Sequence, residues 1–139
     1  MSTAKYVDSN VFFYARILDR EYGKACSSVL RMTSSGELEA STSTLVPIEV
    51  ANSMRKFGLG EAVASEIRAI FSLGIEVHGI EAADAQEAAE IFEKSRINPY
   101  DCLHAAVMKR LGLKEIISAD KEFEKVDWIA RLDPRKVAT

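Results

Sequence analysis

The stretch Lys5-Tyr6-Val7-Asp8-Ser9-Asn10-Val11 decides how the rest of the chain is interpreted. Tyr6 and Val7 favour a strand, and a carboxylate, a hydroxyl and an amide follow them at once. A buried strand that stops on polar residues is typical of a parallel sheet, and open sheets of this kind bind ligands at the carboxyl ends of their strands. Asp8 is therefore either a turn residue that ends a strand or the first member of a site.

Length and composition set the outer limits of the interpretation. The 139 residues, 47% of them hydrophobic and 28% charged, are expected to form one domain over residues 1–139 with a sizeable core. The formal net charge of −3 means that nucleic-acid binding would depend on local basic patches or on bound cations. Two widely spaced cysteines predict neither a disulfide framework nor a zinc site. No apolar run is long enough to span a membrane and no signal segment is evident, so a cytoplasmic location is expected.

Strands are expected to alternate with helices, which favours an α/β class with a mainly parallel sheet. Beyond the first strand, the patterns predict strands over 38–41, 75–78, 115–120 and 128–132. Helices are predicted over 12–18, 21–32, 44–58, 59–73, 81–94 and 98–111, with a turn or a single helical turn over 121–125.

Four acidic residues stand where an element begins or ends, or where a helix turns a polar face. Asp8 ends the first strand, Glu49 lies on a helix rich in apolar residues, Asp101 is in the first turn of a helix, and Asp120 ends the 115–120 strand. Each also has a structural explanation, as a turn residue, a solvated helix face or a helix cap. Singly, none of them predicts a function.

Together the four carboxylates make a stronger prediction. Converging carboxylates repel one another and raise one another's pKa unless a cation lies among them. Oxygen ligands completed by water suit Mg²⁺ or Mn²⁺, and such ions support phosphodiester cleavage. Ser9, Asn10 and Ser118 are small polar neighbours expected to hold ligands or waters in place.

Four motifs, in order along the chain, resemble the motifs of PIN domains. Val7-Asp8-Ser9-Asn10-Val11 resembles their opening motif, and Ile48-Glu49-Val50-Ala51-Asn52 resembles their helical glutamate segment. Tyr100-Asp101-Cys102-Leu103-His104-Ala105-Ala106 is similar to their third acidic motif, and Ser118-Ala119-Asp120-Lys121-Glu122-Phe123 to their fourth. The resemblance covers essentially the whole chain.

This resemblance implies a three-layer α/β/α sandwich with a central parallel sheet and Mg²⁺- or Mn²⁺-dependent ribonuclease activity. The short chain looks most like the toxin of a toxin–antitoxin pair of the VapC kind. Carried over by position, Asp8, Glu49 and Asp101 would be the core metal ligands, and Asp120 a further, more variable one. Ser9 stands where the family often has Thr, a departure that keeps the hydroxyl.

The same resemblance implies partners. These are an RNA substrate, a cognate antitoxin that inserts a segment over the acids, and a second copy of the chain, with Val63, Ile67 and Phe71 as the expected dimer contact. For the RNA backbone, the candidate cations beside the acidic motifs are Arg55, Lys56 and Lys121, with Arg16 and Lys109 as further possibilities. Basic residues at helix ends also favour the helix dipole, which is the competing explanation.

Other residues are given structural roles. His104 follows Asp101 by three residues and shares its helix face, which would suit a residue behind the metal ligands or a general base. Since a metal–carboxylate mechanism needs no histidine, the sequence favours a packing role for His104. Cys102 and Trp128 are interpreted as core or contact residues, and His78 receives no role.

Two alternatives to a nuclease remain open. The first is a non-catalytic module of the same fold that binds nucleic acid or protein. The second, ranked last, is a phospho-acceptor domain, which requires a paired acid beside the first strand and a lysine after a late strand. Here Ser9 and Asn10 follow Asp8, and Lys114 precedes the 115–120 strand instead of following it.

Overall fold

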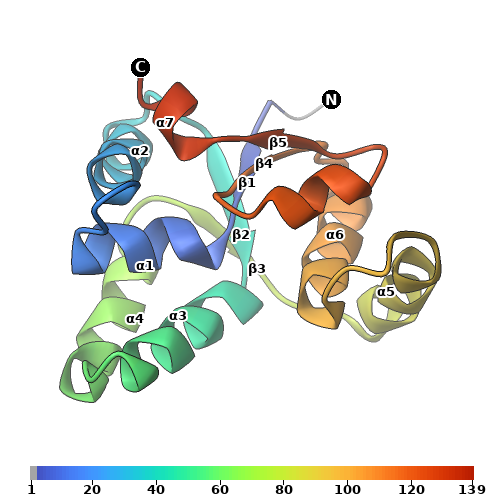
Figure 1. The fold of residues 1–139 in the computed structure, drawn as a ribbon, viewed down its shortest axis with the longest axis horizontal. Coiled ribbons are helices and arrows are strands. Elements are labelled where there is room, and N and C mark those ends of the chain that lie inside the picture. The colour runs from blue at the N-terminus through green and yellow to red at the C-terminus, as the bar shows by residue number, and fades with distance from the viewer. Residues whose placement is uncertain (1–2) are drawn as a thin grey trace.

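The centre of the molecule is a parallel sheet of five strands (Figure 1). The computed structural model describes residues 3–139, so the first two residues of the predicted domain lie outside it. The strands are β1 (Lys5–Val7), β2 (Ala40–Ser43), β3 (Glu76–His78), β4 (Glu115–Ile117) and β5 (Ala130–Leu132), in the order β3-β2-β1-β4-β5. Every pairing is parallel, and Tyr6 of β1 is in register with Ser41 of β2 and Ile116 of β4. The predicted α/β class is confirmed.

Helices cover both faces of the sheet (Figure 1). They are α1 (Ser9–Ile17), α2 (Gly23–Ser35), α3 (Leu45–Lys56), α4 (Val63–Phe71), α5 (Ala82–Ser95), α6 (Pro99–Leu111) and α7 (Pro134–Val137), with 3₁₀ turns η1 (Gly60–Ala62) and η2 (Lys121–Lys125). α1 to α4 lie on one side and α5 and α6 on the other, which makes the predicted three-layer α/β/α sandwich. Across residues 3–139, no helix combines the length and the apolar character that a membrane crossing requires.

Alternation along the central strands divides the apolar residues between two cores. Tyr6 and Ile116 point into the core shared with α5 and α6, whereas their neighbours Val7 and Ile117 point into the core shared with α1 to α4. All four side chains are fully buried. A strand with apolar residues on both faces belongs in the middle of a covered parallel sheet, and β1 and β4 lie there.

Several boundaries differ from the prediction for identifiable reasons. The helix predicted over 12–18 begins at Ser9, because the Asp8 carboxylate caps it by accepting from the Ser9 N–H at 2.8 Å. The strand predicted over 38–41 lies over Ala40–Ser43, where buried hydroxyl groups replace the expected apolar side chains; Thr42 Oγ1 donates to the Val7 carbonyl at 2.8 Å. The helix predicted over 59–73 is divided between η1 and α4, and α7 was not predicted.

The strand order creates the place where a site can form. From β1 the chain proceeds to β2 and β3 on one side, while β4 and β5 lie on the other side. The carboxyl ends of β1 and β4 therefore flank a switch in strand order, where open α/β sheets leave a crevice. Asp8 follows β1 directly, and Ser118 follows β4 directly.

Candidate metal centre

Asp8 is held rigidly at the end of β1, with 4% of its surface exposed. Its Oδ1 accepts from the Ser9 N–H at 2.8 Å. Its Oδ2 accepts from Ser118 Oγ at 2.7 Å and from Asn10 Nδ2 at 3.1 Å. Donors on three sides leave this carboxylate one orientation.

Ser118 and Asn10 tie the segment after β4 to the segment after β1. Ser118 Oγ donates to Asp8 and accepts from Asn10 Nδ2 and from the Asp120 N–H, both at 3.0 Å. Asn10 Oδ1 accepts from the Ala119 N–H at 3.1 Å. The small polar residues picked out in the sequence thus join the two neighbouring strand ends.

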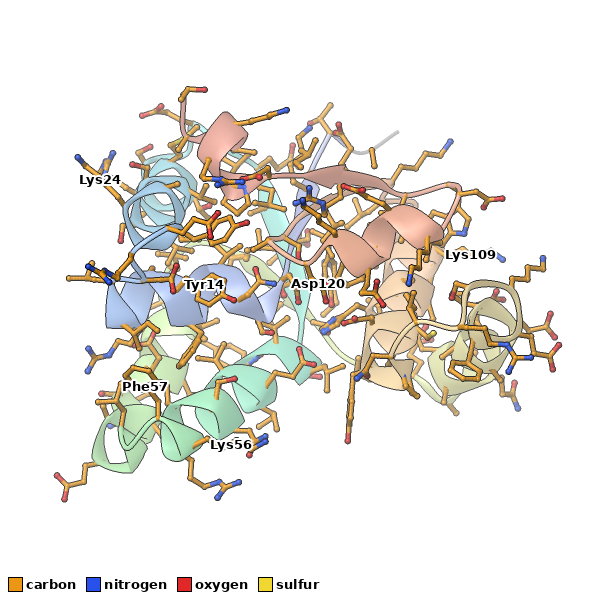
Figure 2. The ribbon with its side chains drawn as sticks, viewed as in Figure 1. Tyr14, Lys24, Lys56, Phe57, Lys109 and Asp120 are labelled. Atoms are coloured by element: carbon orange, nitrogen blue, oxygen red, sulfur yellow. The ribbon has the colours of Figure 1, made fainter. Side chains whose placement is uncertain are left out.

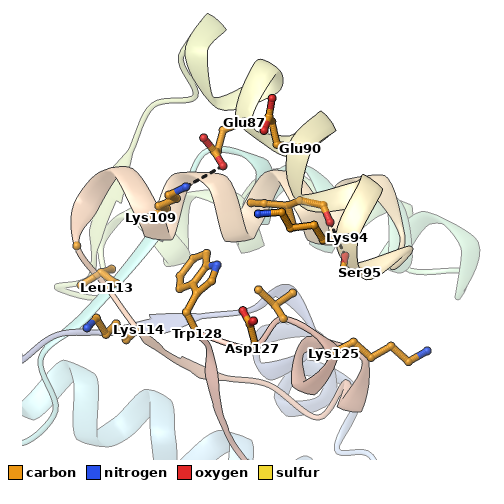
Figure 3. A pocket seen from close by; sticks show the side chains of 13 residues that line it. Glu87, Glu90, Lys94, Ser95, Lys109, Leu113, Lys114, Lys125, Asp127 and Trp128 are labelled. Atoms are coloured by element: carbon orange, nitrogen blue, oxygen red, sulfur yellow. Dashed lines mark hydrogen bonds and ion pairs between the residues drawn. The ribbon is translucent and has the colours of Figure 1, made fainter.

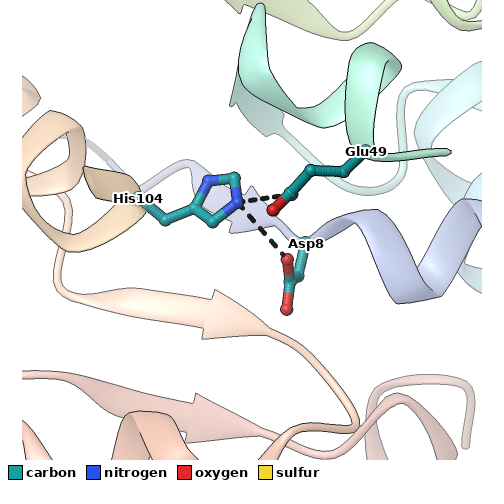
Figure 4. A group of neighbouring side chains, drawn as sticks. All are labelled: Asp8, Glu49 and His104. Carbon is teal, nitrogen blue, oxygen red and sulfur yellow. Dashed lines mark hydrogen bonds and ion pairs between the residues drawn. The ribbon is translucent and has the colours of Figure 1, made fainter. Parts of the chain in front are cut away.

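Glu49 reaches the same place from α3, in the layer opposite α6. Its side chain is 24% exposed, and its Oε1 lies 2.6 Å from Nε2 of His104 (Figure 4). The same nitrogen lies 3.8 Å from Oδ1 of Asp8. The competing explanation, a glutamate that only faces solvent, does not describe Glu49, because Glu49 pairs with a buried histidine on a different layer.

Asp101 and Asp120 complete the set of acids. Asn98 caps α6 by accepting from the Tyr100 N–H at 2.8 Å, and this places Asp101 in the first helical turn. Asp101 is close enough to Asp8 and Asp120 for their charges to act on it, and its carboxyl shares a hydrogen bond with that of Asp120. Asp120 also caps η2, accepting from the Glu122 N–H at 2.9 Å. The charges of Asp8 and Asp120 therefore act on Asp101, while Asp8 and Glu49 meet at His104.

The pKa values of Asp8, Asp101 and His104 are all raised in this cluster. Burial, and then the charges of Asp8 and Asp120, raise the pKa of Asp101 to about 8. Burial also raises the pKa of Asp8, although His104 and the Ser118 hydrogen bond oppose the shift. For His104, burial favours the neutral form, but Tyr6, Glu49 and Asp8 outweigh it and hold the pKa well above its usual range. A cation among these groups would relieve the repulsion.

These residues fit a divalent cation. One atom each of Asp8, Glu49 and His104 lie within 4.8 Å of one another, a spacing that suits a shared ion. Carboxylate oxygens predominate, as Mg²⁺ and Mn²⁺ prefer.

The comparison with known families agrees with this arrangement. A family model described as "PIN domain" matches residues 5–129. The chain belongs to the PIN domain family. No curated protein matches the sequence at a significant level.

Solved structures of low sequence identity share the PIN fold of this chain. The Mycobacterium tuberculosis toxin VapC20, described as cleaving the sarcin–ricin loop, superposes with a TM-score of 0.75 at 17% identity, covering 91% of this chain and 97% of its own. VapBC2 of Rickettsia felis, bound to a promoter DNA fragment, has a TM-score of 0.69 at 16% identity and 94% and 98% coverage. A Klebsiella pneumoniae toxin–antitoxin complex has a TM-score of 0.63 at 14% identity, again covering 94% and 98%.

The basic residues expected near RNA lie at different distances from the acids of this PIN domain. Lys121 adjoins Asp120 and is exposed. Arg55 and Lys56 are in the last turn of α3, about 10 Å along the helix from Glu49. Figure 2 shows Lys56 at the end of α3 away from Asp120.

A hollow of about 500 Å³ lies elsewhere, between α5, the end of α6 and the segment before β5 (Figure 3). Trp128 points into it, and Lys109, one of its lining residues, is ion-paired with Glu87 at 3.0 Å. Lys109 is at the opposite end of α6 from Asp101. None of the four acids lines this hollow, so we place the functional site at the carboxyl ends of the strands, where the titratable groups are perturbed.

Sequence reasoning undervalued His104 and did not consider Tyr6. His104 is fully buried, as a packing residue would be, but it contacts a predicted metal ligand directly. The available signal was the spacing Asp101-x-x-His104, which puts both side chains on one face of α6. Nothing in the sequence connects Tyr6 to this place, because the contact depends on how α6 packs on β1.

Proposed function

We propose that this PIN domain is an endoribonuclease dependent on Mg²⁺ or Mn²⁺ that hydrolyses RNA phosphodiester bonds. The observation that supports the proposal most strongly is the grouping of ligand atoms from Asp8, Glu49 and His104 within 4.8 Å of one another, with Asp101 and Asp120 close enough for their charges to act on this cluster. Structural carboxylates are usually paired with bases, and their pKa values are then lowered. A cluster that keeps its acids close and under-compensated is organised for a ligand.

Each residue has a role in the proposal. Asp8, Glu49 and Asp101 bind the ion, and Asp120 binds it directly or through water. When bound, Mg²⁺ or Mn²⁺ supplies a Lewis acid that polarises the phosphodiester and makes water a better nucleophile. Ser118, Asn10 and the Ser9 N–H keep Asp8 oriented.

Other residues act on the proton and on the substrate. The carboxylate of Asp120 would take up the one proton that the attacking water loses. Lys121 contacts the RNA backbone next to the cleaved bond, and Arg55 and Lys56 contact phosphates further along the strand.

The test is cleavage of a panel of structured RNAs in Mg²⁺, in Mn²⁺ and in EDTA. We expect the wild-type protein to cleave only with a metal, and Asp8→Asn and Asp101→Asn to abolish cleavage while circular dichroism shows a folded protein. Asp127→Asn is the matched control. Asp127 is exposed and precedes β5, so it lies near the amino ends of the strands and not near their carboxyl ends. Cleavage by Asp101→Asn, or cleavage in EDTA, would rule out this assignment. RNA binding without cleavage and without metal binding would favour the non-catalytic module.

We also propose that the protein is the toxin of a toxin–antitoxin pair, acts in the cytoplasm, and forms a homodimer. The structures similar in fold include two toxin–antitoxin assemblies. Exposed apolar side chains on the α1–α4 side, Leu18, Ile48, Phe57 and Phe71, offer contact area for such partners. Induced expression in bacteria is expected to arrest growth, and Asp101→Asn is expected to relieve the arrest. Sedimentation of the purified protein tests the dimer.

A further inference from the structure

A line of buried hydrogen bonds runs from the sheet to Glu49. Tyr6 Oη donates to Ser43 Oγ at 2.8 Å and lies 2.7 Å from Nδ1 of His104. Nε2 of the same ring lies 2.6 Å from Oε1 of Glu49. Tyr6, Ser43 and His104 are completely buried, whereas Glu49 reaches solvent.

The ring of His104 has no freedom to turn. Tyr6 holds it at Nδ1 and also packs against it edge to face, with ring centroids 5.5 Å apart and an interplanar angle of 64°. A turned ring would leave two buried polar groups without partners, which costs about 1–3 kcal/mol for each group. The position of Nε2 is therefore set by β1 and not by Glu49.

Glu49 depends on this nitrogen more than Asp8 depends on any one of its partners. Asp8 has three donors around its carboxylate. Among residues 3–139, the contact with His104 is the one hydrogen bond that the Glu49 carboxylate makes. A glutamate has three side-chain torsions, so without this partner its carboxylate would sample several positions.

We propose that His104 is a positioning residue for the metal centre. Its Nε2–H donates to Oε1 of Glu49 and leaves Oε2 as the metal-binding oxygen, while Tyr6 fixes the ring from behind. A carboxylate only accepts hydrogen bonds, so Nε2 carries the proton in this contact. This inference rests on the proposed function, because it assigns a role towards the metal that the function requires.

The rival role for His104 is direct coordination, since Nε2 lies within the 4.8 Å group of candidate ligand atoms. Two observations favour positioning. Nε2 is already 2.6 Å from a carboxylate oxygen, a distance typical of a strong, charge-assisted hydrogen bond. The neighbouring acids supply oxygen ligands, which hard divalent ions prefer to nitrogen.

The chain allows a matched pair of substitutions at this position. In His104→Gln the side-chain amide nitrogen takes the place of Nε2 and still donates to Glu49. In His104→Asn the amide reaches only as far as Nδ1, so it can bond Tyr6 but not Glu49. Both variants are polar and smaller than histidine, and circular dichroism checks that both are folded. His78→Gln, on β3, is the control for the only other histidine.

The measurement is Mn²⁺ affinity by titration of the free-ion electron paramagnetic resonance signal, which needs no substrate. We expect the Mn²⁺ affinity of His104→Asn to fall about 10-fold or more below that of the wild type, which is the usual effect of removing a residue that hydrogen-bonds a metal ligand. The affinities of His104→Gln and His78→Gln are expected to stay within about threefold of the wild type. Electron spin-echo modulation of bound Mn²⁺ is expected to show no directly coordinated nitrogen.

Each other result has a distinct meaning. Equal Mn²⁺ affinities for His104→Asn and His104→Gln would overturn the positioning role. In that case Mn²⁺ binding by the wild-type protein would still support the proposed metal-dependent nuclease. Nitrogen coordination overturns positioning in favour of direct ligation. Absence of Mn²⁺ binding by the wild-type protein removes both the metal dependence and the role inferred for His104.

Discussion

Replacing Asp101 with Asn is expected to make the metal-free protein more stable while destroying the proposed activity. The reason is the position of Asp101, where burial and the charges of Asp8 and Asp120 oppose ionisation. Asn keeps the shape of the side chain and a hydrogen bond with Asp120, and it removes one negative charge from the cluster. The same substitution at an ordinary surface carboxylate would change stability little.

The size of the effect follows from the pKa of Asp101. The pKa is raised from 3.8 to about 8, and at 1.36 kcal/mol per unit this difference sets an upper limit of about 6 kcal/mol on the penalty above pH 8. Because the side chain is partly exposed, solvent screening reduces the penalty. We expect Asp101→Asn to gain about 1–3 kcal/mol at pH 8.5, within the range of a single relieved charge repulsion.

The raised pKa of Asp101 also determines the direction in which the free energy of unfolding changes with pH. The folded chain holds the Asp101 proton more tightly than the unfolded chain, so ionisation lowers the free energy of unfolding as pH rises from about 4 to 8. Below pH 4 the carboxyl is protonated in both states, and the variant gains nothing from its lost charge. The advantage of Asp101→Asn therefore grows through this window and levels off above pH 8.

The assay is urea denaturation in EDTA at several pH values between 4 and 9, with wild type, Asp101→Asn and the exposed control Asp127→Asn. The quantity to compare is the difference in the free energy of unfolding between each variant and the wild type, since other titrating groups then cancel. The reasoning is refuted if Asp101→Asn is no more stable than wild type at pH 8.5, or if its advantage does not grow with pH. Added Mg²⁺ is expected to stabilise the wild type and to remove the advantage.

Two further predictions concern residues away from the candidate metal centre, Gly23 and Asp84, and a third concerns the pH dependence of Mg²⁺ binding at that centre. Gly23→Ala is expected to cost about 1–3 kcal/mol in urea denaturation, because the new Cβ would meet the Leu18 carbonyl carbon at 2.6 Å; unchanged stability would show that this backbone shifts freely. Asp84→Ala is expected to cost about 1–2 kcal/mol, since Asp84 holds the exposed Arg110 at 2.9 and 3.0 Å and caps α5 by accepting from the Glu81 N–H at 2.8 Å, and a loss below about 0.5 kcal/mol would contradict this. Mg²⁺ affinity, measured by calorimetry, is expected to rise up to about tenfold per pH unit from pH 6 to 8 as Asp101 loses its proton, and an affinity independent of pH would contradict that coupling.

The sequence alone predicts those features of the fold that depend on a single strand or helix. Tyr6 and Val7 followed by Asp8 predict a buried strand with a polar end, and the structure confirms that strand. Asn98 and Pro99 predicted the start of α6, which the structure also confirms. These features depend on local preferences, which neighbouring residues alone can express.

Sequence reasoning failed where the outcome depends on elements that are distant in the chain. Ser41, Thr42 and Ser43 were not expected to be buried, because their hydroxyl groups find partners only after β1 and β2 pair. The contact of His104 with Glu49 was not expected, because it links positions 55 residues apart on helices of different layers. The roles of the four acids in metal binding and catalysis remain predictions.

The hydrogen bond between Glu49 and His104 has a mechanical consequence. α3 and α6 belong to opposite layers, and this contact bridges them past the end of the sheet (Figures 1 and 4). An ion held by Asp8, Glu49 and Asp101 would connect α3 and α6, which belong to the two outer layers, to the central sheet. The three layers would therefore move less relative to one another when the ion is bound. Amide hydrogen exchange in the first turns of α3 and α6 is therefore expected to slow when Mg²⁺ is added, and exchange that stays unchanged would show that the layers move independently of the centre. A loaded nuclease would then be a stiffer molecule than an empty one, and more resistant to proteolysis.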